Sequence, residues 1–239
     1  MSVGEFVTGL GFVTGIAVLI WSASRQGLAT DGMAKVAAAG LLGGIAGAKL
    51  TQLIYEGWPT KVPWYVVFDP RTGGKALMGG LLIGWFTVVV AKRLLGIKRS
   101  TGDHFALALP AGEAVGRIGC FLNGCCFGRQ CDLPWSVHQH GLDRHPTQIY
   151  SAVASAMLFS ILFWLKPRLH RDGDLWRCYL IGFGSIRFVL ESFRENEALA
   201  FGLSSMQLLC IELLVFGTAG FALAMRRESK LQRLEVESP

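Results

Sequence analysis

The stretch LMGGLLIGWFTVVVAKRLL, residues 77–95, decides the fold class because it is an apolar run that ends in basic residues. An α-helix needs about 20 apolar residues to cross the hydrocarbon core of a bilayer. Lys92 and Arg93 stand near the end of the run, where long basic side chains can reach lipid head groups. We therefore interpret residues 77–95 as a transmembrane helix.

Long apolar runs of the same kind recur along the whole chain. Hydrophobic residues make up 51% of the 239 residues and charged residues 17%, against about 25% charged residues in a typical soluble domain. We predict an all-α, polytopic integral membrane bundle of about seven transmembrane helices. The predicted spans are 3–24, 35–55, 77–95, 105–122, 147–165, 175–193 and 203–225. They form a single transmembrane domain, residues 1–225, followed by a polar cytoplasmic tail, residues 226–239.

Basic residues in alternate loops predict the orientation, because positively charged loops stay on the cytoplasmic side. The basic segments are the loops after the first, third and fifth spans and the tail, with Arg25; Lys92, Arg93, Lys98 and Arg99; Lys166, Arg168 and Arg171; Arg226, Arg227, Lys230 and Arg233. The N-terminus is then outside and the C-terminus cytoplasmic, and loops 57–74 and 124–144 face outward. This topology accounts for the net charge of +6 without a nucleic-acid partner.

Ionisable residues inside two predicted spans indicate an anion site. Charges within the hydrocarbon are costly, so they are usually paired and functional. Glu113 and Arg117 are four residues apart, as are Arg187 and Glu191, so each pair shares one helix face. Both pairs lie toward the outer helix ends, where two arginines form a receptor for a lipid phosphate. The alternative is that the pairs only hold the bundle together, and Arg194 also fits an anchor at the membrane interface.

A predicted outer loop gathers thiols and imidazoles. They are Cys120, Cys125, Cys126, Cys131, His138, His140 and His145. Three interpretations stay open. Two of the thiols form a disulfide in an oxidising compartment, where a bridge between neighbouring cysteines is sterically awkward. Cysteine and histidine bind zinc, although the spacing is not a standard C-x₂-C pair. Or one thiolate, activated by an arginine or a histidine, is a nucleophile.

The string GRIGCFLNGCCFGR, residues 116–129, resembles the signature G-R-x-G-N-F-x-N-x-E-x-x-G of the prolipoprotein diacylglyceryl transferase family. The matching residues are Gly116, Arg117, Gly119, Phe121, Asn123 and Gly128. Three later stretches are similar to family motifs in the expected order: HPTQIY (145–150), IRFVLESFR (186–194) and FGLSSMQLL (201–209). GIAGAKLTQLIY (44–55) is a weaker match. The resemblance extends from the second predicted span to the seventh.

The resemblance implies seven transmembrane helices in the bacterial inner membrane, with the active region facing the periplasm. It implies a transferase that moves the diacylglyceryl group of phosphatidylglycerol to a cysteine thiol of a prolipoprotein and releases glycerol phosphate. It assigns catalysis to Arg117, Arg187, His145 and Glu191. It assigns substrate binding to Arg117, Asn123, Gly128, Arg187, Arg194, Gly79 and Gly80. No cofactor and no metal are expected.

Four departures from the family pattern leave other functions open. Met78 stands where the family has a histidine before Gly79 and Gly80. Cys120 replaces an asparagine, Cys125 a glutamate and Ser151 a second glutamate. In the first alternative, the chain is a transferase in which other groups transfer the proton, and His145, Cys125 and Cys126 are the candidates. In the second alternative, the chain is an altered paralogue that binds lipid without catalysing a reaction. The third alternative is a membrane thiol-redox or metal protein that uses Cys120, Cys125, Cys126 and Cys131.

Overall fold

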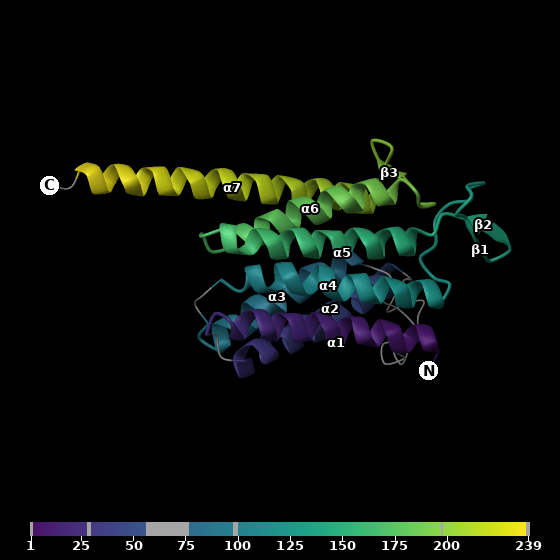
Figure 1. Ribbon diagram of the computed structural model, residues 1–239, viewed down its shortest axis with the longest axis horizontal. Coiled ribbons are helices and arrows are strands. Elements are labelled where there is room, and N and C mark those ends of the chain that lie inside the picture. Colours follow the sequence, from purple (N-terminus) through teal and green to yellow (C-terminus); the bar gives the residue numbers. More distant parts are fainter. Residues whose placement is uncertain (1, 28–29, 56–76, 98–99, 197, 238–239) are drawn as a thin grey trace. The chain divides into compact units, whose positions relative to one another are not determined.

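The computed structural model describes residues 2–27, 30–55, 77–97, 100–196 and 198–237 (Figure 1). The chain forms two compact units, one of residues 1–19 and 100–239 and the other of residues 20–99. The predicted outer loop 57–74 lies outside the described residues.

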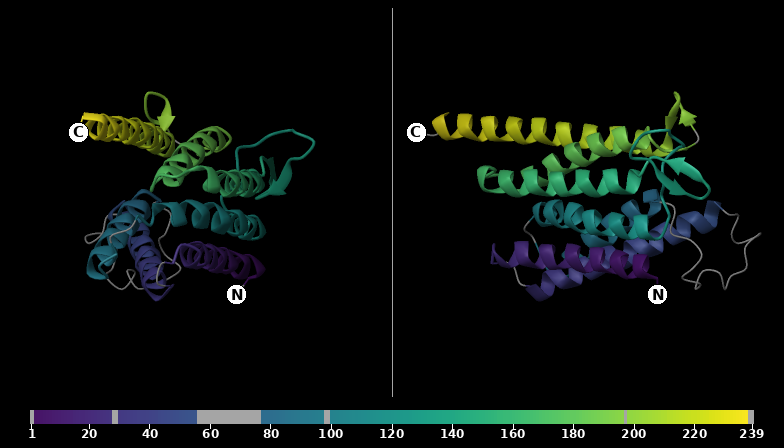
Figure 2. Two further views of the ribbon diagram at one scale, coloured as in Figure 1. Left: turned by 60° about the vertical axis from the view of Figure 1, so that its left-hand side comes forward. Right: turned by 45° about the vertical axis from the view of Figure 1, so that its right-hand side comes forward.

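The first unit contains most of α1 (Val3–Ser24) together with α4 (Gly102–Leu122), α5 (Thr147–Leu165), α6 (Asp174–Glu191) and α7 (Ser205–Glu237). Helix α5 packs against both α4 and α6, and α6 packs against α7 (Figure 2). The Asp103 carboxylate, in the first turn of α4, accepts backbone N–H bonds from Gly173 (2.7 Å) and Trp176 (2.9 Å) at the start of α6. These bonds satisfy amides that a helix N-terminus leaves open, and they attach α6 to α4.

The second unit contains α2 (Thr30–Tyr55) and α3 (Leu77–Leu94), which pack through small residues. A Cβ atom added to Gly47 would lie 2.3 Å from the carbonyl oxygen of Gly79. The Thr87 hydroxyl donates to the carbonyl oxygen of Ala39 across the same interface, at 2.9 Å. Close backbone approach through glycine is the usual mode of helix association in lipid.

The described residues contain seven α-helices of 18 residues or more, one for each predicted span. Five of them, α1, α2, α4, α5 and α7, are long and apolar enough to cross a membrane. Helix α6 is not among these five, and it carries Asp174, Arg177, Arg187 and Glu191. The mainly helical class and the apolar helices are confirmed. The number of spans, their orientation and the single transmembrane domain stay predictions.

The last helix differs from its prediction at both ends. It begins at Ser205 and not at residue 203, because Ser204 and Gln207 form a capping box. The Gln207 N–H donates to Ser204 Oγ at 3.2 Å, and the Ser204 N–H donates to Gln207 Oε1 at 3.0 Å. The helix then continues to Glu237 through most of the predicted polar tail. A helix of 33 residues is about 50 Å long, which exceeds the hydrocarbon thickness of about 30 Å.

Two short hairpins add strands that the all-α prediction lacked. They are β1 (Val137–Gln139) with β2 (Leu142–Arg144), and β3 (Ala198–Ala200) with β4 (Leu203–Ser204). The β1–β2 turn consists of His140 and Gly141, both with positive φ, as a type I′ turn requires. The hairpin lies beyond the end of α4 and the start of α5 (Figures 1 and 2).

Candidate active site

Both predicted arginine–glutamate pairs form within their helices. Arg117 donates through Nε (3.1 Å) and Nη2 (3.0 Å) to Glu113 Oε1. Arg187 Nη2 lies 2.7 Å from Glu191 Oε2, and both side chains are buried, with 7% and 4% of their surface exposed. Glu191 Oε1 also accepts a bond from the Asn196 amide. The second pair is therefore held in one geometry within a nearly dry site.

Arg187 faces a crevice between α4, α5 and α6. The crevice is lined by Glu113, Ser151, Ser155, Leu158, Phe183, Ile186, Arg187 and Leu190. Arg187 Nε is buried and has no hydrogen-bond partner among the described residues. A buried donor without a partner costs roughly 1–3 kcal/mol, so this N–H is suited to an anionic ligand. Ser151, where the resemblance implies a glutamate, contributes a neutral side chain to the lining, and Glu113 contributes a carboxylate.

The surroundings of Arg187 carry an excess of positive charge. Arg117, Arg194 and Glu113 all lie within electrostatic range of its guanidinium. With Glu191, the group holds three cations and two carboxylates, so one positive charge is not compensated within it. Like charges at close range in a low dielectric repel strongly, and a bound anion removes that repulsion. A phosphate matches the planar, multidentate donors of arginine.

His145 is buried beside aromatic rings just before α5. Its ring centroid lies 5.2 Å from that of Phe193, and its Nδ1 lies 3.4 Å from the Tyr150 hydroxyl, which accepts a bond from Trp135 Nε1 at 2.8 Å. Burial, and then the charge of Arg129, lower the pKa of His145 below its usual 6.5. The imidazole is therefore neutral at pH 7 and able to accept a proton.

Gly128 brings three segments together. Its N–H donates to the carbonyl oxygen of His145 at 3.0 Å. A Cβ atom at this position would lie 2.7 Å from His145 Cβ, from the Phe193 carbonyl oxygen and from Thr147 Cγ2. Only glycine permits this approach, so Gly128 lets the three segments pack together, and substrate binding by Gly128 stays a prediction.

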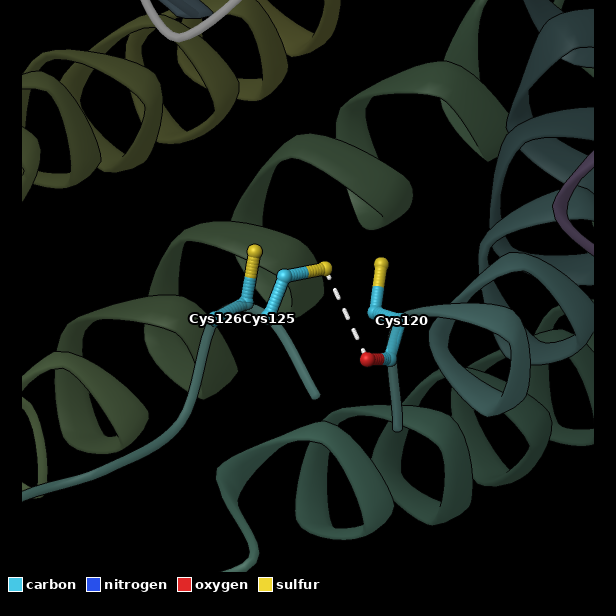
Figure 3. Close-up of side chains that lie close together, drawn as sticks. All are labelled: Cys120, Cys125 and Cys126. Atoms are coloured by element: carbon cyan, nitrogen blue, oxygen red, sulfur yellow. Dashed lines mark hydrogen bonds between the residues drawn. The ribbon is translucent and has the colours of Figure 1, made fainter. Parts of the chain in front are cut away.

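Three of the four predicted thiols meet at the end of α4. The Sγ atoms of Cys120, Cys125 and Cys126 lie within 4.8 Å of one another, whereas Cys131 is not part of this group (Figure 3). All six cysteines, each within the described residues, are free thiols. A hydrogen bond from the Cys120 thiol and the charges of Arg117 and Arg194 lower the pKa of Cys126 to about 5, against the effect of burial.

His138 and His140 lie on the β1–β2 hairpin. His138 Nδ1 is 3.1 Å from Asp143 Oδ1 in an exposed pair. His140 Nε2 is 2.8 Å from the Gly124 carbonyl oxygen, which ties the hairpin to the chain just before Cys125. These two imidazoles support the loop and do not join the thiol group.

Two residues of α5 hold the thiol loop, and the residue assignments made from the sequence missed them. Gln148, which is fully buried, donates through Nε2 to the Cys125 carbonyl oxygen at 2.7 Å and to Gln139 Oε1 at 3.1 Å. The Thr147 hydroxyl donates to the Cys126 carbonyl oxygen at 2.9 Å. Both residues stand in the motif HPTQIY, and this was the only sequence signal that could have identified them.

Asn123, Gly79 and Gly80 are placed by local packing. Asn123 Oδ1 accepts a bond from the Ser2 hydroxyl at 2.9 Å at an exposed position. Gly79 and Gly80 belong to the second unit, where a Cβ atom on Gly79 would lie 1.8 Å from Thr51 Oγ1. Helix packing thus gives Gly79 a structural role, and substrate binding by these three residues stays a prediction. The Met78 side chain is outside what the structure describes.

Known proteins resemble this chain over most of its length. The model of the prolipoprotein diacylglyceryl transferase family matches residues 6–223. Three similar proteins bear the name phosphatidylglycerol–prolipoprotein diacylglyceryl transferase. The one from Paracidovorax citrulli is 34% identical, over 80% of this chain and 76% of its own. The one from Verminephrobacter eiseniae is 36% identical, over 70% and 65%. The one from Vibrio vulnificus is 31% identical, over 96% and 90%. The chain therefore belongs to the prolipoprotein diacylglyceryl transferase family, as its motifs predicted.

Proposed function

We propose that this chain transfers the diacylglyceryl group of phosphatidylglycerol to a cysteine thiol of a prolipoprotein and releases glycerol phosphate. The observation that carries the proposal is the buried Arg187, which lines a crevice together with Glu113 of the Arg117–Glu113 pair and whose Nε–H has no hydrogen-bond partner among the described residues. The substrates are those in the names of the similar proteins.

In the proposed mechanism, Arg187 and Arg117 hold the phosphate of the donor lipid, and Glu191 and Glu113 orient the two guanidinium groups. The acceptor thiolate attacks the glyceryl carbon that carries the phosphate. The sulfur–carbon bond forms as the carbon–oxygen bond breaks, and the leaving phosphate oxygen keeps the electron pair. Preorganised cations stabilise that developing charge. The neutral His145 accepts the proton that the thiol loses.

The proposal places the protein in the bacterial inner membrane with seven spans and the site facing the periplasm. The N-terminus is outside and the C-terminus cytoplasmic, with residues 1–225 as one transmembrane domain. Support comes from the basic residues of alternate loops and from the first unit, where α4 and α6 end and α5 and α7 begin on the same side (Figure 1). A site at that side is within reach of head groups of the outer leaflet.

The test is turnover of head-group-labelled phosphatidylglycerol by the full chain in vesicles, with a lipobox peptide as acceptor. We expect Arg117→Ala and Arg187→Ala each to lower the release of glycerol phosphate by about 100-fold or more. Arg226→Ala, an exposed arginine of α7, is the matched control and should leave the rate unchanged. Wild-type rates in both site variants would refute the phosphate clamp. Lipid binding without any release by the wild type would favour the lipid-binding alternative.

A further inference from the structure

The three thiols of Cys120, Cys125 and Cys126 are arranged as in a metal site. Its three Sγ atoms lie within 4.8 Å of one another. Zn–S bonds of about 2.3 Å in a tetrahedron place sulfur atoms about 3.8 Å apart. The observed Sγ separations exceed that spacing by at most about 1 Å, and Figure 3 shows all three sulfurs on the same side of the turn. The spacing C-x₄-C-C is not a standard zinc motif, so the convergence depends on backbone geometry.

The backbone turns sharply to make the three thiols meet. Gly124 has φ +63° and Cys126 has φ +60°, a left-handed conformation that is rare for a residue with a side chain. The Cys125 N–H donates to the Cys120 carbonyl oxygen at 3.1 Å and closes the turn. Thr147 and Gln148 hold the carbonyl groups of Cys126 and Cys125 from α5. A costly conformation that is fixed by these three hydrogen bonds is characteristic of a functional site.

The charge around the thiols also suits a metal. Three thiolates and one Zn²⁺ carry a net charge of −1, and Arg117 and Arg194 lie within electrostatic range of Cys126. Among the described residues, no fourth histidine, cysteine, aspartate or glutamate completes the group. A zinc ion with three protein ligands keeps an open position, as catalytic zinc sites do.

We propose that Cys120, Cys125 and Cys126 bind one zinc ion and that its open position receives the acceptor thiol. The second part rests on the proposed function. The acceptor thiol loses its proton to His145 and binds as a thiolate, which is the nucleophilic form. Its sulfur then forms the bond to the glyceryl carbon while the carbon–oxygen bond to phosphate breaks. The thioether product is a weaker ligand and leaves the metal. This site replaces the asparagine and glutamate of the family signature.

Zinc binding is tested on the reduced, full-length chain in detergent, loaded with Zn²⁺ and freed of excess metal. We expect about one zinc per chain by elemental mass spectrometry and loss of that zinc in Cys120→Ser, Cys125→Ser and Cys126→Ser. Cys131→Ser, in the same loop but outside the group, is the matched control and should keep it. Zinc should also protect three thiols from alkylation and raise the unfolding temperature in the wild type and the control. A reduced wild-type chain that takes up no zinc, or equal loss in the control, would overturn the site.

The open position is tested with Co²⁺ in place of zinc. A peptide with the lipobox cysteine should strengthen the sulfur-to-cobalt charge-transfer absorption, and the same peptide with serine should not. An unchanged spectrum would overturn acceptor binding at the metal. This test and the activity test fail independently. Normal glycerol phosphate release by the zinc-free chain would overturn the role of zinc and leave the transferase. Zinc and peptide binding without any release would overturn the transferase and leave the metal site.

Discussion

Replacing Arg187 by methionine separates the structural role of the buried pair from its role in lipid binding. Methionine keeps much of the volume of arginine and removes its charge. Glu191, with 4% of its side chain exposed, then loses its ion partner and keeps the bond from Asn196. Breaking a buried ion pair typically costs about 3–5 kcal/mol. The remaining amide bond places the expected loss of unfolding free energy near the low end, at about 3 kcal/mol.

The expected loss of unfolding free energy can be expressed as a decrease in the unfolding temperature, which depends on the length of the chain. One kcal/mol lowers the unfolding midpoint of a chain of this length by about 2–4 °C, so Arg187→Met should lower it by about 6–12 °C. The double variant Arg187→Met, Glu191→Met removes both charges and should recover to within about 1 kcal/mol of the wild type. The measurement is thermal unfolding in detergent, followed by tryptophan fluorescence.

Activity should follow a different order from stability. Both variants lack the Arg187 guanidinium, which lines the crevice, so both should release glycerol phosphate about 100- to 1,000-fold more slowly than the wild type. Wild-type activity in the stable double variant would refute the assignment of Arg187 to the phosphate. An unchanged unfolding temperature in Arg187→Met would refute the buried ion pair itself.

Further predictions concern two glycines and His145. Gly79→Ala should lower the free energy of unfolding by about 1–3 kcal/mol, because the added Cβ meets the Gly47 carbonyl oxygen at 2.6 Å, whereas Gly9→Ala, with open space around it, should be neutral in the same thermal assay. Gly128→Ala should destabilise by a similar ~1–3 kcal/mol and also slow transfer, because the backbone at Phe193 must move; normal activity would show that this packing does not position the site. The lowered pKa of His145 means that the unfolded chain binds its proton more readily, so stability from this group is present above pH ~6.5 and is lost as the pH falls through its folded pKa. His145→Asn should therefore flatten the decline in unfolding temperature between about pH 7.5 and 5.5, and an unchanged decline would assign it to other groups.

Local patterns were enough to predict the helices and the two arginine–glutamate pairs. An apolar segment long enough to span the bilayer has few ways other than a helix to form the hydrogen bonds of its backbone N–H and C=O groups. The spacing of four residues places Arg187 over Glu191 whatever the tertiary structure is. The prediction of a helix from residue 203 was wrong by two residues because Leu203 looks apolar. The capping bonds of Ser204 with Gln207 start the helix later.

Such local patterns could not predict that three cysteine thiols meet at the end of α4, nor which residues hold their loop in place. Whether Cys120 meets Cys126 depends on the left-handed turn at residues 124–126, and a cysteine gives no sign of positive φ in the sequence. The role of Gln148 depends on which carbonyl group its amide reaches from another segment. The packing of Gly79 against Thr51 requires that α2 and α3 be aligned in register. Each of these features is a contact between distant residues, and one sequence contains no direct record of it.

Two of the four departures from the family pattern meet in the structure. Cys120 and Cys125 stand at the asparagine and glutamate positions, and the structure brings both to Cys126. A single such replacement would only remove a polar group, whereas the two together create a set of three sulfur ligands. Arg187 and Glu191 keep their geometry at the crevice. Substitutions of the arginines should therefore weaken handling of the phospholipid donor, and substitutions of the cysteines should weaken activation of the acceptor while donor binding is retained.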